Sequence, residues 1–98
     1  MSLLHTVNKS PFASTALDDC LARMTTDAGL LLIEDGVYAA LSGTPQAARL
    51  AGRRVFALAP DLAARGLAER PLADGVELVD YDGFVRLCTE YSAVQSWF

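Results

Sequence analysis

The sequence predicts an α/β protein, a small three-layer sandwich in which a mainly parallel sheet of four or five strands is flanked by helices. Short apolar runs alternate along the chain with segments of helical periodicity, an order that favours parallel strands joined by right-handed crossovers. The length of 98 residues suits one hydrophobic core, because domains cluster at about 100–150 residues. We expect a single domain over residues 1–98, since no repeat or linker divides them.

The first predicted strand covers residues 3–7, a short apolar run. Residues 8–11 are turn formers that end in a proline and break this strand. The first helix then begins near Ser14 or Thr15, either of which can cap it, and two aspartates in its first turn suit the positive end of the helix dipole. We expect this helix to end near residue 23 or 24.

The second strand is predicted at residues 30–33, a continuous apolar run typical of a strand buried on both faces. The polar residues 34–36 close it and define an edge of the sheet. Residues 37–41 fit a short helix, residues 42–45 interrupt it, and residues 46–50 fit a second helical stretch.

Residues 54–59 form the third predicted strand, which Pro60 ends. Asp61 is then expected to cap a helix over residues 62–65, and Gly66 to stop it.

The fourth predicted strand, residues 76–79, alternates apolar with polar positions, which places it nearer an edge of the sheet. A final helix is expected from Phe84 to about Tyr91, because its apolar residues recur at spacings near three and four.

Composition limits the possible functions. Apolar residues make up 52% of the chain, more than a domain of this size needs for its interior, and the simplest cover for the excess is another subunit. A net charge of −4 argues against direct contact with nucleic acid, which needs a concentrated basic surface. No apolar run approaches the ~18–20 residues of a membrane span, and residues 1–12 resemble no targeting segment. We therefore expect a cytoplasmic protein without membrane contact.

The sequence also offers little for binding a metal or cofactor. Cys20 and Cys88 lie too far apart for a CxxC pair or a zinc knuckle, and the chain has a single histidine. No glycine-rich phosphate-binding loop follows any predicted strand. We expect no metal and no cofactor.

Cys20 is the candidate reactive residue, because a thiolate can act as a nucleophile and carry sulfur. Leu17, Leu21 and Met24 lie at neighbouring helical positions, so an ordinary buried thiol is the competing interpretation. Cys88 lies in the apolar stripe of the last helix, and we interpret it as a core residue.

Three further places have a structural and a functional interpretation. His5 lies in a strand expected to be buried, where a lone histidine more often bonds to the backbone than takes part in catalysis. Residues 34–36 follow a buried strand at the edge where α/β sheets bind ligands; alternatively, Asp35 caps the next helix and Gly36 makes the turn. The aromatic pair at residues 97–98 is expected to pack on the core or on a partner.

Several segments, taken in order, resemble the DsrH and TusB family. The run Leu-His-Thr-Val-Asn-Lys-Ser-Pro-Phe at residues 4–12 resembles the opening of these proteins. Four later segments resemble the family in the same order and extend the likeness over nearly the whole chain: residues 31–40, 61–66, 79–85 and 95–97.

This resemblance implies a DsrEFH-like α/β fold and membership of a cytoplasmic heterohexamer built from three related subunits. The implied partners are a DsrE/TusD-like subunit, a DsrF/TusC-like subunit and a DsrC/TusE-like sulfur carrier protein. The resemblance also implies that the principal persulfide cysteine is on the DsrE/TusD-like subunit, which leaves this chain an accessory or partly active role.

The family has two branches, and a cysteine in the first helix resembles the DsrH branch. We therefore expect persulfide relay in intracellular sulfur oxidation, with Cys20 as candidate persulfide acceptor. The alternatives are a TusB-like subunit for 2-thiolation of the tRNA wobble uridine and a non-catalytic structural subunit that completes the complex.

Overall fold

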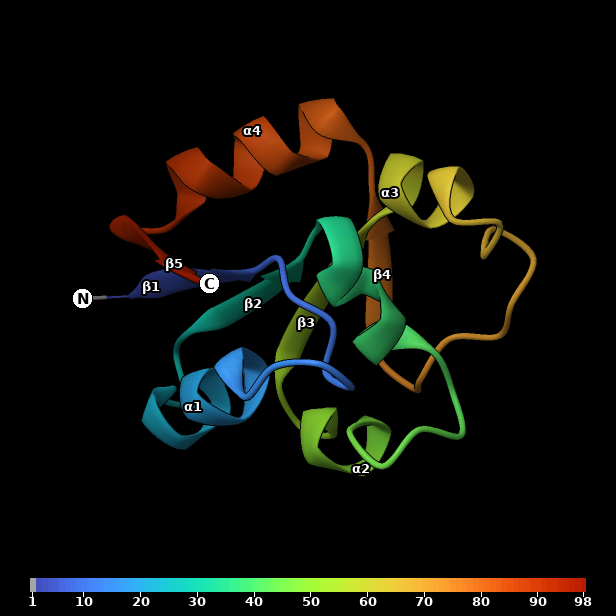
Figure 1. Cartoon of the computed structure of the whole chain (residues 1–98). Coiled ribbons are helices and arrows are strands. Elements are labelled where there is room, and N and C mark those ends of the chain that lie inside the picture. The colour runs from blue at the N-terminus through green and yellow to red at the C-terminus, as the bar shows by residue number, and fades with distance from the viewer. Residues whose placement is uncertain (1) are drawn as a thin grey trace.

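The computed structural model describes residues 2–98 and has a five-stranded, fully parallel sheet at its centre, in the order β4-β3-β2-β1-β5 (Figure 1). The predicted parallel α/β sandwich is confirmed. In chain order the elements are β1 (Leu3–Val7), α1 (Ala16–Arg23), β2 (Gly29–Leu32), the 3₁₀ helix η1 (Glu34–Ala40), α2 (Ala47–Leu50), β3 (Arg54–Leu58), α3 (Ala59–Ala64), β4 (Val76–Val79), α4 (Tyr81–Glu90) and β5 (Ala93–Trp97).

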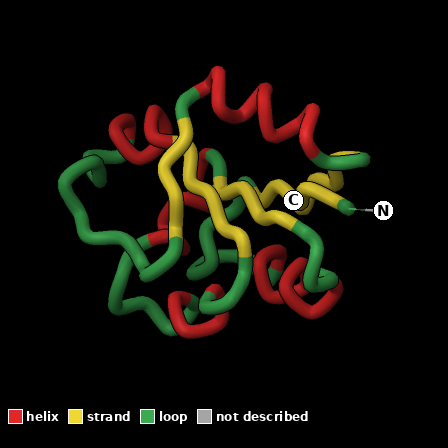
Figure 2. The backbone as a smooth tube through the Cα atoms, turned by 180° about the vertical axis from the view of Figure 1, so that it is seen from behind, coloured by secondary structure: helices red, strands yellow, loops and turns green. Residues whose placement is uncertain are grey.

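The two faces of the sheet are covered unequally. α4 runs along one face, and α1 and α2 lie on the opposite face (Figure 1); Figure 2 shows the strand layer between them from behind. The larger apolar cluster lies on the α1 side and includes residues of η1 and α3 as well. The smaller cluster lies beneath α4, where Leu87 and Tyr91 contact Leu4, Leu31 and Phe56 of the three central strands.

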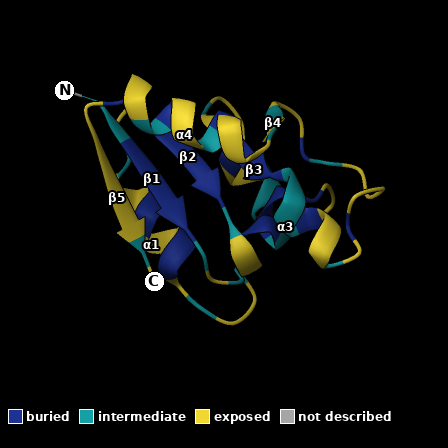
Figure 3. Cartoon of the chain, turned by 90° about the horizontal axis from the view of Figure 1, so that it is seen from above, coloured by how far each residue is buried: buried dark blue, intermediate teal, exposed yellow. Residues whose placement is uncertain are grey.

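Burial follows the order of the strands. All four residues of β2 are buried, as are the last four of β1 and of β3. β4 and β5 form the two edges and are largely exposed (Figure 3). A strand with two neighbours and helices on both faces has apolar residues at consecutive positions, which is why the central strands were recognisable in the sequence. The edge position expected for β4 is confirmed.

β5 was not assigned as a strand from its sequence, where only the terminal aromatic pair drew attention. It pairs in parallel with β1 from Ala93, opposite Leu3, to Trp97, opposite Val7. The Thr6 hydroxyl also donates a hydrogen bond to Ser96 Oγ at 3.1 Å. Because β5 is exposed along most of its length, it lacks the apolar pattern of a buried strand and depends on pairing with β1.

Two helix starts differ from the prediction. α3 begins at Ala59, so Pro60 lies in its first turn, where a missing N–H costs nothing, and Asp61 does not cap the helix. α4 begins at Tyr81 because the Asp80 side chain accepts a hydrogen bond from the Gly83 N–H at 2.8 Å. α1 runs to Arg23 as expected, but its N-cap Thr15 makes no side-chain capping bond.

Candidate functional site

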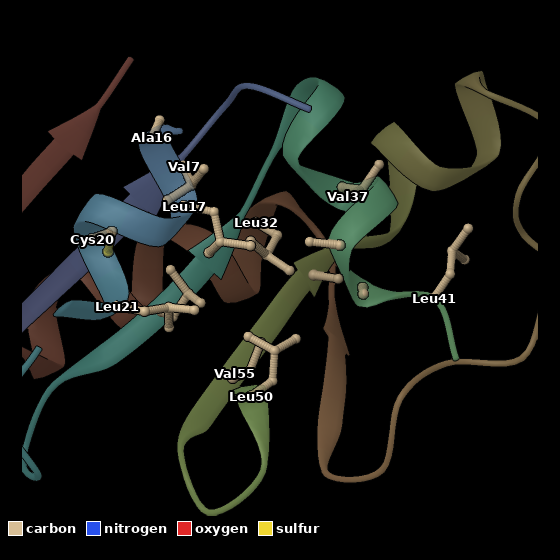
Figure 4. Packing of buried hydrophobic residues seen from close by; sticks show 14 of the residues in the cluster. Val7, Ala16, Leu17, Cys20, Leu21, Leu32, Val37, Leu41, Leu50 and Val55 are labelled. Atoms are coloured by element: carbon tan, nitrogen blue, oxygen red, sulfur yellow. The ribbon is translucent and has the colours of Figure 1, made fainter. Parts of the chain in front are cut away.

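Cys20 lies on the inner side of α1 with none of its surface exposed. Figure 4 shows it beside Leu17 and Leu21, among the apolar residues that pack between α1 and the sheet. This position agrees with the interpretation of Cys20 as a buried thiol, which rests on the helical spacing of its apolar neighbours. A sulfur-bearing donor cannot contact this thiol unless α1 moves.

The environment of Cys20 also disfavours its thiolate. Burial raises the pKa of Cys20 to about 12, and the positive charge of Arg53 only partly opposes this rise. At pH 7 the thiol form therefore strongly predominates over the thiolate, which is the nucleophilic form. In this conformation Cys20 is a poor nucleophile.

Cys88 lies on the other side of the sheet. It is partly buried on α4 and packs against the smaller apolar cluster. The sheet thus separates the two thiols, which cannot form a disulfide or exchange sulfur within one chain. The interpretation of Cys88 as a core residue agrees with its packing against the smaller cluster.

His5 is buried in β1, and its partner is a side chain instead of the expected backbone group. Nδ1 of His5 accepts a hydrogen bond from the Trp97 indole N–H at 2.9 Å. Burial lowers the pKa of His5, so the neutral ring is favoured, with its proton on Nε2. This bond joins β5 to β1 and leaves His5 a structural role.

The edge formed by the carboxyl ends of β2 and β3 is closed by polar contacts. Glu34 has a φ of 49°, and its backbone N–H donates to Asp61 Oδ2 at 2.6 Å. Arg65 donates through Nε to Asp35 Oδ1 at 2.9 Å and through Nη1 to the Asp61 carbonyl at 3.2 Å. Asp61 therefore caps the positive-φ residue at the start of η1 instead of its own helix. Asp35 pairs with Arg65 and caps nothing, so both capping predictions were wrong.

Gly36 is required at this edge by close backbone packing. A Cβ atom added to Gly36 would lie 2.2 Å from the carbonyl oxygen of Val7. η1 therefore lies directly against the end of β1, in the space where a ligand would sit if residues 34–36 lined an open crevice. The contacts of these residues tie η1 to β1 and α3.

The described residues give no sign of a metal or membrane site. Residues 2–98 contain no group of three or more His, Cys, Asp or Glu side chains placed to hold a metal ion. Among the same residues, no helix is both long and apolar enough to cross a membrane.

The influence of Arg53 on Cys20 was missed by reasoning from the sequence. Arg53 lies in the turn before β3, far from Cys20 along the chain, and its charge acts on the thiol only because α1 and α2 share one face of the sheet. Arg53 and Arg54 are adjacent in sequence, but their side chains have different surroundings. Arg54 lies over the Phe56 and Tyr91 rings.

The chain belongs to the class of small α/β proteins with a fully parallel five-stranded sheet, and its first helix carries a buried cysteine. Solved structures share the fold: the ychN protein of Escherichia coli covers 98% of both chains with a TM-score of 0.85 at 20% identity. A protein of unknown function from Methanobacterium thermoautotrophicum covers 97% of this chain and 96% of its own with a TM-score of 0.73 at 19% identity.

Sequence comparisons identify the family more narrowly. The model of the family described as DsrH like protein matches residues 9–94. Protein TusB of Pectobacterium parmentieri is 38% identical over 97 residues, 97% of this chain and 100% of the relative. Protein TusB of Escherichia coli O81 (strain ED1a) is 37% identical over the same shares of the two chains. The chain belongs to the DsrH-like family.

Proposed function

We propose that this protein is a subunit of a cytoplasmic sulfur-transfer complex of the TusB type, which acts in 2-thiolation of the tRNA wobble uridine. The observation that carries this proposal is the full-length similarity to proteins named TusB at 37–38% identity. The comparisons therefore favour the alternative interpretation over sulfur oxidation, the function that a cysteine in the first helix predicts. Because Cys20 is buried, its presence in the first helix is weak support for the sulfur-oxidation function.

Within this complex we assign the chain a non-catalytic role. The support is the state of Cys20, which is fully buried with a pKa raised to about 12. On this proposal the principal persulfide cysteine is on a TusD-like (DsrE-like) subunit, a TusC-like (DsrF-like) subunit completes the assembly in a heterohexamer, and a TusE-like (DsrC-like) protein carries the sulfur onward.

Exposed apolar side chains support an assembled state. Tyr81 and Val85 lie one turn apart on α4 and are 59% and 64% exposed, and Phe98 at the chain end is 85% exposed. Large apolar side chains that the chain leaves in water are commonly covered in a complex. Trp97 packs against the core, as one of the two expectations for the terminal pair has it, whereas Phe98 is exposed and on this proposal contacts a partner subunit.

The experiment combines gene deletion with complementation. Deleting the gene should abolish 2-thiouridine in tRNA, measured by mass spectrometry of digested nucleosides, and the wild-type gene should restore it. If deletion leaves 2-thiouridine unchanged, the TusB-type function is wrong. Loss of intracellular sulfur oxidation in the same strain would favour the DsrH-type function instead.

A Cys20→Ser variant tests the non-catalytic role. It should restore 2-thiouridine as well as the wild-type gene does, with Cys88→Ser as the matched control.

The second candidate role is that of Cys20 as a persulfide acceptor, which the nearby charge of Arg53 favours. It requires α1 to open during transfer. A loss of thiolation in the Cys20→Ser strain, with the complex still assembled, would support this role, and so would 32 Da of added mass on Cys20 after the purified complex is treated with a sulfur donor. Absence of both would exclude it.

A further inference from the structure

The amino-terminal edge of the sheet has a hollow that no role discussed above uses. It lies between the loop that follows α1 and the turn between α2 and β3, with a volume of about 390 Å³. Its polar lining comes from Thr25 and Thr26 on one side and from Arg49 and Arg53 on the other. Two guanidinium groups and two hydroxyl groups supply only hydrogen-bond donors and weak acceptors, which suits an anion.

The two arginines differ in how far the protein already neutralises them. Arg49 forms an ion pair with Asp18 of α1. Arg53 is half-buried, and its Nε donates to the Arg49 carbonyl oxygen at 3.0 Å. Within residues 2–98, no carboxylate lies within ion-pair distance of Arg53. Its four remaining N–H donors thus stay available on the wall of the hollow.

Two other charged groups, Asp27 and Arg23, lie near the hollow, and neither is in an ion pair with Arg53. Asp27 accepts a hydrogen bond from the Thr25 hydroxyl, which is thereby occupied, whereas no such bond involves the Thr26 hydroxyl among the residues described. Arg23, in the last turn of α1, adds a further positive charge at the same end of the sheet. Arg53 is therefore the cation in this hollow that the chain does not itself neutralise.

We propose that the hollow binds a small tetrahedral oxyanion such as sulfate or phosphate, with the Arg53 guanidinium as its principal ligand and Arg49 and Thr26 beside it. The fork of a guanidinium matches two oxygens of such an anion, and a half-buried position strengthens the attraction because water screens it less. The site is independent of the proposed function, since it uses neither a partner subunit nor a reaction of Cys20.

The hollow lies one helical turn along α1 from Cys20. The Met24 backbone N–H donates to the Cys20 carbonyl oxygen at 3.1 Å, and Met24 also lines the hollow. Arg53 lowers the pKa of the thiol, so an anion that neutralises Arg53 should raise it. By linkage, ionisation of Cys20 and binding of the anion oppose each other.

The direct test is an NMR titration of the ¹⁵N-labelled protein with sodium sulfate and, separately, sodium phosphate, at constant ionic strength maintained with sodium chloride. We expect saturable shifts of the amide signals of residues 24–26 and 49–53. Arg53→Gln should weaken binding at least tenfold, and Arg53→Lys, which keeps the charge but loses the fork, should weaken it less. Arg86→Gln, a charge-matched change on α4 across the sheet, should leave binding unchanged.

A third titration identifies the source of the anion. A short single-stranded RNA at the same total phosphate concentration should bind no more tightly than free phosphate if the hollow takes a small anion. Tighter RNA binding that Arg53→Gln abolishes would keep the site and identify a phosphodiester as its ligand. Shifts that do not saturate, or that persist unchanged in a well-folded Arg53→Gln or Arg53→Lys protein, would overturn the proposal.

Discussion

Trp97 donates its indole N–H to Nδ1 of His5 at 2.9 Å, a side-chain hydrogen bond between two neighbouring strands from opposite ends of the chain. Trp97 is partly buried against the larger apolar cluster, and His5 is buried. β5 is an edge strand, and no strand within residues 2–98 pairs with its outer side. This bond therefore adds to the pairing with β1, the Thr6–Ser96 hydrogen bond and the packing of Trp97 in holding the last strand.

Acid should destabilise the protein through His5. Burial lowers its pKa in the folded state below the ordinary 6.5, so below that pH the unfolded chain binds a proton more readily than the folded one. The free energy of unfolding should be constant with respect to His5 above about pH 7.5, and it should fall as the pH drops below 6.5. Urea unfolding at pH 7.5, 6.5 and 5.5 measures the free energy of unfolding, and in the His5→Gln variant the slope of this free energy against pH should be smaller. An equal slope in that variant would contradict the prediction.

Trp97→Phe should lower the free energy of unfolding by about 1–3 kcal/mol. The substitution keeps an aromatic ring but leaves the buried Nδ1 of His5 without its donor, and an unsatisfied buried acceptor costs about that much. Urea unfolding at pH 7.5 gives the difference. Phe98→Ala is the matched control, because Phe98 is 85% exposed and its loss should change stability by less than about 0.5 kcal/mol. Equal effects of the two changes would argue against a specific role of the Trp97 bond.

Gly36→Ala should destabilise the fold severely. The new methyl group would lie 2.2 Å from the Val7 carbonyl oxygen, a backbone atom that cannot move aside without disturbing β1. We expect a loss above about 3 kcal/mol, or failure to fold, seen by circular dichroism and thermal unfolding.

Gly52→Ala provides the comparison for Gly36. Gly52 has a φ of +79° with open space around its Cβ position, so only backbone strain of about 1–2 kcal/mol applies. A Gly36→Ala protein as stable as Gly52→Ala would show that η1 does not need its close contact with β1.

The two cysteines should differ in reactivity toward a thiol reagent such as dithionitrobenzoate. Cys20 is fully buried with a pKa raised to about 12, whereas Cys88 is partly exposed. In native protein at pH 8 we expect one thiol to react within minutes and the second only in denaturant, and Cys88→Ser should remove the fast phase. Fast labelling of Cys20 in the Cys88→Ser protein would show that α1 opens readily and would strengthen the case for Cys20 as a sulfur carrier.

The core strands and the first helix could be predicted because the pattern of apolar and polar residues in each segment reflects which positions are buried. Residues 30–33 and 55–59 are continuous apolar runs, and strands buried on both faces need such runs. Cys20 could be placed on the inner side of α1 from the spacing of Leu17, Leu21 and Met24 alone. The resemblance of the opening residues 4–12 also led to the right family.

Helix starts and polar edges were predicted less well, because the same side chain can satisfy several backbone groups. Asp61 has a side chain suited to capping a helix, yet its carboxylate accepts a hydrogen bond from the Glu34 backbone N–H, which folding brings alongside it. Asp35 likewise pairs with Arg65, the residue at the end of α3. Such choices depend on which backbone N–H groups lie within reach after the strands have paired.

The sequence by itself determined the fold class, the three central strands and the family, because apolar periodicity and segment order are local properties of the chain. Tertiary structure alone decided the pairing of β5, the bond between Trp97 and His5, and the position of Arg53 beside Cys20. Each of these joins residues far apart in sequence. Their energies come from pairing, burial and charge at close range, which no segment has until the sheet has formed.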